Sequence, residues 1–187
     1  MSLLSETLVD EWLNRQGFLT MRGIKNAGVD EIDLLGVRPL QRGLEAWHVE
    51  VQISFNPIAY ISKLCKSERV RTKRAGSSAV LRTHDVLEES VREWVLKKYD
   101  SPKKVKLREK VWPGLSWKRY LVHAVARYPQ ELELIRESGV KLVSFRKVLE
   151  DLNAERGLTG ASGTDISDII RYFGSGSNRL HRRPKAR

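Results

Sequence analysis

The chain has 187 residues, of which 41% are hydrophobic and 30% are charged, the composition of an ordinary globular protein. It contains no run of about 18 apolar residues, so no membrane-spanning helix is expected. Its 34 Lys and Arg residues outnumber its 23 Asp and Glu residues and give a formal net charge of +11. This surplus favours a polyanion, above all a nucleic acid, as the partner.

Two features bear on the compartment. The start, MSLLSETLVDEW, has no basic segment and reaches an acid at Glu6, so it does not predict a signal peptide. Cys65 is the single cysteine and can form no internal disulfide, which suits the reducing cytoplasm. Because Cys65 lies on an apparent helix among basic residues, a semi-buried structural thiol is favoured over a catalytic one.

The first half of the chain predicts a helix followed by three strands. Residues 3–16 place apolar side chains on one face at a spacing of 3.6 residues, and Gly17 fits the end of such a helix. Strands are expected at 18–24, 31–37 and 44–54, and the third is rich in β-branched and aromatic residues. After Pro57 the pattern becomes helical to about Arg74, and a loop follows.

The second half alternates helices and strands. A helix is expected at 84–99, whereas residues 100–117 are expected to be irregular or a basic β excursion. The remaining elements are a strand at 118–126, a helix at 129–138, a strand at 140–145 and a helix at 146–155. This order predicts an α/β domain over residues 1–154, with a mixed central sheet and helices on both faces. Residues 155–187 would add a Gly/Ser-rich linker, a short helix and a basic tail.

Asp33, Glu50 and Gln52 stand within two predicted strands whose centres are largely apolar. Side chains alternate between the faces of a strand, so Glu50 and Gln52 share a face with His48, opposite the apolar core face. Asp33 lies on the preceding strand, and an antiparallel pairing would bring it beside Glu50. Two adjacent carboxylates repel each other unless a cation bridges them, and oxygen ligands of this kind suit Mg²⁺ or Mn²⁺.

A helix that carries an acid, then DEIDLLG, then HVEVQIS resembles the layout of the PD-(D/E)xK nuclease superfamily. This superfamily includes many restriction endonucleases and the archaeal Holliday junction resolvases. The likeness covers about residues 3–153, with the motif residues within 6–60. It implies a restriction-endonuclease-like αβββαβ core and a metal-dependent DNA endonuclease that hydrolyses phosphodiester bonds.

The resemblance also assigns roles to single residues. Asp33 and Glu50 correspond to the motif carboxylates that hold Mg²⁺ or Mn²⁺, and Glu6 corresponds to a helix-one acid that supports the metal in some members. Gln52 departs from the pattern, because most members have lysine at this position. Glutamine carries no charge, but it can orient the attacking water through a hydrogen bond. Lys63 or Lys66 could supply the missing charge from the next helix.

Basic residues form three clusters, at 63–82, 97–110 and 179–187, which suit contacts to nucleic-acid phosphates. The resemblance adds Asn56 and Tyr60, which have the spacing of a polar residue and a tyrosine on a DNA-contacting helix of several members. The expected nucleic-acid-binding residues are Asn56, Tyr60, Lys63, Lys66, Arg69, Lys73, Arg74, Arg179, Arg182 and Arg183. Double-stranded or branched DNA is the expected partner, and a homodimer would be compatible with it.

Other interpretations fit the same sequence. Because of Gln52, the nuclease fold could lack catalysis and serve as a nucleic-acid-binding module. The basic tail would equally suit an RNA-binding protein. Trp112 and Trp117 lie among basic residues and could either stack on bases or close the core beneath a loop.

Overall fold

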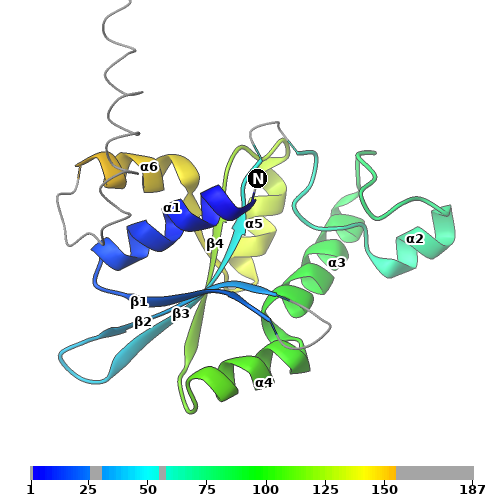
Figure 1. Ribbon diagram of the computed structural model, residues 1–187. Helices are drawn as coiled ribbons and strands as arrows, with labels where there is room; N and C mark the ends of the chain where they lie inside the picture. The colour runs from blue at the N-terminus through cyan, green and yellow to red at the C-terminus, as the bar shows by residue number, and fades with distance from the viewer. Residues whose placement is uncertain (1, 26–30, 55–57, 155–187) are drawn as a thin grey trace, which may run out of the picture.

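The computed structural model describes residues 2–25, 31–54 and 58–154, which form one sheet flanked by helices (Figure 1). The predicted second unit at 155–187, with Arg179, Arg182 and Arg183, lies outside the described residues, as does Asn56. In chain order the elements are α1 (Ser2–Arg15), β1 (Leu19–Ile24), β2 (Ile32–Pro39), β3 (Leu44–Gln52), α2 (Lys66–Thr72), α3 (His84–Val95), a π-helix η1 (Leu96–Asp100), α4 (Pro102–Val111), β4 (Trp117–His123), α5 (Pro129–Glu137), β5 (Lys141–Ser144) and α6 (Phe145–Ala154).

The five strands form a mixed sheet in the order β1-β2-β3-β4-β5. The first three strands are an antiparallel meander, and β4 and β5 pair in parallel with their neighbours. The predicted adjacency of the strands at 31–37 and 44–54 is therefore confirmed. Gly36 sits on β2 where the chain passes under Phe18, because a Cβ there would lie only 3.1 Å from the Phe18 ring.

One face of the sheet packs against α1 and α6, which lie side by side (Figure 1). Its core includes Trp12 of α1, Val148 of α6 and the inward residues Trp47 and Val49 of β3. The Trp47 ring also stacks on Tyr120 of β4 at a centroid distance of 3.8 Å. Burial of this apolar face is what holds α1 on the sheet.

The opposite face packs against α3, η1, α5 and α4. Val91, Trp94 and Tyr99 cover Leu121 of β4 in one cluster, and Leu107 of α4 covers Leu35 of β2 in another. Trp112 and Trp117 pack against this second cluster with their rings 6.2 Å apart, which favours the core interpretation of the two tryptophans. The expectation of an α/β fold with helices on both faces of a mixed sheet is confirmed.

Residues 100–117 differ from the prediction, because they contain the helix α4 instead of irregular or β structure. Ser101 caps its first turn and Pro102 occupies the first position, both favourable for a helix start. The sequence shows no apolar periodicity here because two of the three buried positions are charged: Lys104 and Arg108 accompany Leu107 on the inner face. A helix whose inner face is polar has no apolar stripe in its sequence.

The helix predicted from Pro57 to about Arg74 was also wrong over most of its length, since only Lys66–Thr72 is helical. The backbone N–H groups of Ile61 and Ser62 are bonded to the Glu131 carboxylate, at 2.7 and 2.8 Å. The N–H of Leu64 is bonded to the carbonyl of Gly76 at 2.8 Å. These groups have distant partners in place of the carbonyls four residues earlier, so the segment before α2 is not helical, and Ile61, Ser62 and Leu64 are buried against the domain.

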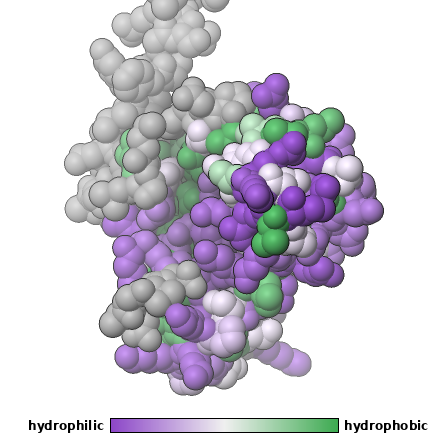
Figure 2. All heavy atoms as spheres, turned by 90° about the vertical axis from the view of Figure 1, so that its right-hand side faces the viewer, coloured by the Kyte–Doolittle hydropathy of each residue, from purple (hydrophilic) through white to green (hydrophobic). Residues whose placement is uncertain are grey.

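Helix α2 projects at one end of the molecule and buries none of its residues (Figure 1). The face on this side of the molecule is largely hydrophilic (Figure 2). Cys65, which precedes α2, is fully buried, as expected for a structural thiol. In the described part of the chain, no helix has the length and apolar character needed to cross a membrane.

Candidate functional site

The candidate site begins where the ladder between β2 and β3 ends. The last paired residues are Leu34 and Val49. One residue earlier on β2, the carboxylate of Asp33 accepts the backbone N–H of Val51 at 2.7 Å. Since Val51 lies between Glu50 and Gln52, this bond fixes the Asp33 carboxylate beside the polar end of β3.

The electrostatic environment of Asp33 is that of a carboxylate close to another negative charge. Burial and the nearby charge of Glu50 raise the pKa of Asp33 to about 7, against the opposing effects of Lys98 and the Val51 N–H. Glu6 of α1 makes the smallest of the contributions that raise this pKa. The structure therefore brings Asp33 and Glu50 together, with Glu6 in the same field.

Glu50 is 1% exposed and is surrounded by positive and hydrogen-bond-donating groups. Lys104 Nζ lies 2.5 Å from one carboxylate oxygen and Lys98 Nζ lies 2.5 Å from the other. Burial alone would raise the pKa of Glu50, but the hydrogen bond from His48 and the two ammonium charges lower it to about 2. Glu50 is therefore ionised at neutral pH.

His48 is fully buried and holds Glu50 from the side opposite to solvent. Its Nε2 lies 3.0 Å from Glu50 and its Nδ1 lies 2.7 Å from the Arg108 guanidinium. Because arginine only donates, Nδ1 is the acceptor, so the proton of the neutral ring is on Nε2 and is donated to Glu50. Burial lowers the pKa of His48 to about 4, which keeps the ring neutral. Arg108 also donates to the Tyr99 carbonyl and is thereby fixed in place.

Two consecutive helical segments deliver the lysines. Lys98 lies in the π-helix η1, a rare backbone form that is frequent at functional sites. The next residue, Tyr99, is fully buried and its hydroxyl donates to the Tyr120 carbonyl at 2.8 Å, which locks η1 onto β4. Lys104 is 2% exposed on the inner face of α4, whereas the Lys98 side chain is 29% exposed at the rim.

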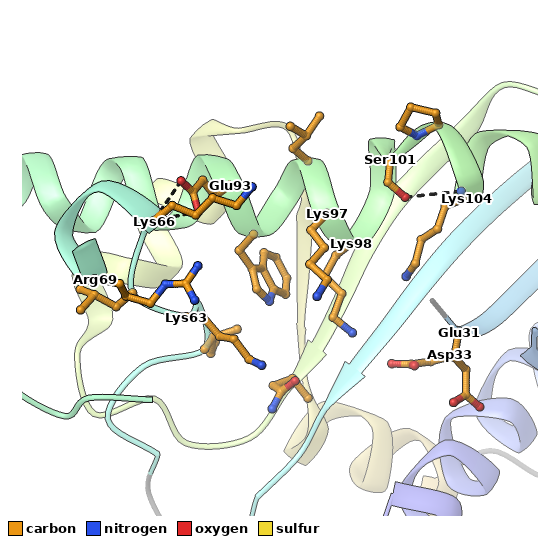
Figure 3. Close-up of a pocket in the computed structure, with 16 residues that line it drawn as sticks. Glu31, Asp33, Lys63, Lys66, Arg69, Glu93, Lys97, Lys98, Ser101 and Lys104 are labelled. Atoms are coloured by element: carbon orange, nitrogen blue, oxygen red, sulfur yellow. Dashed lines mark hydrogen bonds between the residues drawn. The ribbon is translucent and has the colours of Figure 1, made fainter. Parts of the chain in front are cut away.

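A pocket of about 1040 Å³ opens beside these groups. It is lined by Glu31, Asp33, Gln52, Ile61, Lys63, Leu64, Lys66, Arg69, Glu93, Trp94, Leu96, Lys97, Lys98, Ser101, Pro102 and Lys104. In Figure 3 the amino groups of Lys63, Lys98 and Lys104 point into the hollow that Asp33 borders. The lining contains six basic and three acidic side chains, so its net charge is positive when all of them are ionised.

Whether a divalent cation fits this site depends on how many oxygen atoms are available to coordinate it. No cluster of three or more His, Cys, Asp or Glu side chains suited to a metal occurs within the described ranges. Among those residues, the second oxygen of Asp33 has no hydrogen-bond partner, and a cation would offset both the burial and the charge of Glu50 that raise the pKa of Asp33. Glu50 could offer its outer oxygen once Lys98 leaves it. The residues present thus fit one cation shared by Asp33 and Glu50, in competition with Lys98.

The other predicted site residues are partly brought together. Gln52 lines the pocket at the end of β3, on the face of Glu50. Lys63, Lys66 and Arg69 line it from the opposite side, whereas Lys73 and Arg74 are exposed and outside the lining.

Tyr60 is engaged within the fold. Its ring stacks on Tyr128 at 4.6 Å and lies 3.9 Å from the Arg82 guanidinium, and its hydroxyl accepts the N–H of Arg82. These contacts hold the loop after α2 against the body of the domain.

The sequence-based prediction missed the groups that surround Glu50. It assigned the compensating charge to Lys63 or Lys66, whereas the ammonium groups that contact Glu50 are those of Lys98 and Lys104. His48 was treated as a neighbour by strand alternation, without its bond to Glu50. The available signal was the start of α4 at Ser101 and Pro102, because a helix there places Lys104 and Arg108 on one face.

Comparisons with known proteins give little further guidance. No protein-family model matches the chain, and no curated protein matches it. One solved structure, described as the protein of unknown function AF1548, is similar with 15% sequence identity and a TM-score of 0.42. The aligned region covers 80% of this chain and 65% of that protein, so the chain spans less than two thirds of its length.

Proposed function

We propose that this protein is a metal-dependent deoxyribonuclease with the restriction-endonuclease-like architecture of the PD-(D/E)xK superfamily. The observation that carries the proposal is the pairing of Asp33 and Glu50 at the end of two adjacent strands, at the edge of a basic pocket. A helix followed by an antiparallel meander and a parallel fourth strand agrees with the order of elements in that superfamily.

The chain's own residues would bind and orient the substrate and position the water. A divalent ion held by Asp33 and Glu50 would supply a Lewis acid and lower the pKa of a bound water. Gln52, on the same face of β3, would orient that water through its amide. His48 and Lys104 keep the inner side of Glu50 fixed, so that only its outer oxygen can change partners.

Lys98 takes the role of the lysine that most members of the superfamily have at the position of Gln52. Its ammonium group lies 2.5 Å from Glu50 at the more exposed rim, so it is the partner that can yield to a cation. Once displaced, it would still border the pocket and could neutralise charge on the phosphate. Loss of Lys98 should therefore raise the affinity for Mn²⁺ and lower the rate of cleavage.

A second candidate function is a DNA-binding module without catalysis. It is favoured by one observation: both oxygens of Glu50 are already neutralised by lysines, one of which is 2% exposed. In such a module the ion pairs would be purely structural, and neither Mn²⁺ nor Mg²⁺ would bind near Asp33.

One experiment separates the two functions. Cleavage of duplex, single-stranded, flapped and four-way DNA, and of structured RNA, is measured in Mg²⁺ and in Mn²⁺, alongside calorimetric titration of Mn²⁺. The parent should cut DNA, and Asp33→Asn and Glu50→Gln should abolish cleavage, with Asp33→Asn also losing Mn²⁺ binding. Lys98→Met should bind Mn²⁺ more tightly than the parent and cut more slowly.

Matched controls are Asp85→Asn and Glu137→Gln, at exposed positions outside the pocket lining. They should cut like the parent. A parent that neither binds Mn²⁺ nor cuts any substrate would refute the nuclease and leave the binding module. Equal cleavage by the parent and the Asp33 and Glu50 variants would place the chemistry elsewhere.

A further inference from the structure

The pocket has two halves that differ in how their charges are paired. At the half near β3, Lys98 and Lys104 are bonded to Glu50. At the other half stand Lys63, Lys66 and Arg69, whose side-chain nitrogens have no hydrogen-bond or ion-pair partner among the described residues. The Nε of Arg69 is buried as well as unpartnered, which is costly unless a ligand completes it.

The segment that carries these cations is fixed by its backbone. The N–H of Leu64 is bonded to the Gly76 carbonyl at 2.8 Å and the N–H of Cys65 to the Ser90 hydroxyl at 3.0 Å. The N–H of Lys66 is bonded to the Glu93 carboxylate at 3.1 Å. Three successive residues are thus hydrogen-bonded to α3 or to the loop after α2. The side of the pocket formed by Lys63, Lys66 and Arg69, the cationic wall, is therefore in place before any ligand binds.

Lys63 and Arg69 start from adjacent positions on this wall. A Cβ placed on Gly76 would lie 3.5 Å from Cδ of Arg69 and 3.7 Å from Cβ of Lys63, so both side chains border the same point of the loop after α2. Figure 3 shows Arg69, Lys63 and Lys66 on the same side of the hollow. Three cations on one side of a pocket suit an anion with several oxygens, such as a phosphodiester.

Apolar side chains also line the pocket. Ile61, Leu64 and Trp94 line the pocket and are themselves mostly buried, and Leu96 at the rim is 58% exposed. An apolar and aromatic surface beside cations is the arrangement that binds unpaired bases, whose faces stack while the backbone is held electrostatically. Contacts to phosphates alone would not require this apolar surface.

We propose that the pocket admits an unpaired segment of a DNA strand. A phosphate lies on Lys63, Lys66 and Arg69, and the neighbouring base lies against the exposed apolar lining at Leu96. The substrate class is therefore DNA with a single-stranded segment, such as a free end or a flap. The inference rests on the proposed function for the identity of the ligand, and it adds that this strand is the one presented to Asp33 and Glu50.

The test is equilibrium binding in EDTA, so that no cleavage occurs. Fluorescence anisotropy is measured with a single strand of about 12 nucleotides, with the same strand in a duplex, and with a strand that contains abasic sites. The parent should bind the single strand at least tenfold more tightly than the duplex, and the abasic strand several-fold more weakly than the intact one.

The decisive variant is Lys63→Gln/Lys66→Gln, with Lys141→Gln/Lys147→Gln as the matched control. The control changes the same charge at two exposed lysines of β5 and α6 that lie outside the three basic clusters and do not line the pocket. The pocket pair should weaken single-strand binding about tenfold or more and reduce the salt slope by about 1.4, from about 0.7 for each lost phosphate contact. The control pair should change it less than about threefold, because the pocket holds none of its contacts.

Equal losses in the two pairs, or a duplex bound as tightly as the single strand, would overturn the inference. Arg69→Gln provides a second test and should weaken binding of the single strand, as Lys63→Gln/Lys66→Gln does. The nuclease proposal is tested separately by cleavage. If the parent does not cut, but Lys63→Gln/Lys66→Gln weakens single-strand binding and the control pair does not, the nuclease proposal is refuted and the strand-binding pocket is retained.

Discussion

Replacing Asp33 by Asn should stabilise the metal-free protein at alkaline pH. The side chain is half-buried, near the charge of Glu50, and its pKa is raised from the ordinary value of 3.8 to about 7. Because the folded pKa lies above the unfolded one, the folded state binds more protons between pH 4 and pH 7. Folding stability therefore falls as the pH rises through this window, and the loss is complete above about pH 8.

The size of the effect follows from the shift. At about 1.4 kcal/mol for each pH unit, ionised Asp33 costs the folded state about 4 kcal/mol above pH 8. Asn carries no charge, and its amide oxygen can still accept the Val51 N–H. We expect a gain of about 2 to 4 kcal/mol at pH 8.5 and almost none at pH 4, where Asp33 is protonated in the parent.

The measurement is urea unfolding in EDTA at pH 4, 6 and 8.5 for the parent, Asp33→Asn and the control Asp85→Asn. Asp85 is exposed in the first turn of α3, so the control should lose no more than a few tenths of a kcal/mol at any of the three pH values. Adding Mn²⁺ at pH 8.5 should stabilise the parent and leave Asp33→Asn unchanged.

A different outcome would refute the electrostatic account of the site. If Asp33→Asn is as stable as the parent at pH 8.5, neither burial nor the charge of Glu50 penalises the ionised carboxylate. If the variant is less stable at every pH, its bond to Val51 matters more than the repulsion. Either result would remove the physical reason for a cation at this position.

The remaining predictions concern the buried ion pairs, the loop before α2 and the tail. Glu50→Gln should lower the free energy of unfolding at pH 7.5 by about 3 to 5 kcal/mol, because it leaves the ammonium of Lys104 buried without its counter-charge. In urea unfolding, Glu50→Gln/Lys104→Met should recover most of this loss. No recovery would show that the broken ion pair is not its cause. Since the pKa of Glu50 is lowered to about 2, the stability that it provides should be full above pH 4.5 and lost as the pH falls toward 2, by acid titration of the parent against Glu50→Gln. Glu131→Gln should cost about 1 to 3 kcal/mol, because one amide oxygen cannot replace both carboxylate oxygens bonded to Ile61 and Ser62, and faster hydrogen exchange at these two amides should accompany the loss. Truncation after Gly176 removes five basic residues and no acid and should flatten the salt dependence of DNA binding, so an unchanged slope would exclude the tail from the interface.

Much of the fold could be predicted because its signals are local. The alternation of Trp47, Val49 and Val51 with His48 and Glu50 identifies β3 and its two faces, and the 3.6-residue spacing in α1 identifies its buried side. The pairing of Asp33 with Glu50 followed from the same pattern, since only a short connection separates β2 from β3 and favours an antiparallel hairpin. Such features depend on side chains a few positions apart, which the sequence displays directly.

Only the tertiary structure decided what surrounds Glu50. Lys98, Lys104 and the Arg108 that orients His48 come from 48 to 60 residues farther along the chain. The helix α4 was missed for the same reason, because its inner face is charged and has meaning only opposite Glu50. The sequence by itself determined that a carboxylate pair exists at the end of two strands. Whether each carboxylate meets a lysine, a proton or a cation depends on charges brought close by folding, because electrostatic energies in the protein interior vary with distance in space and not with separation along the chain.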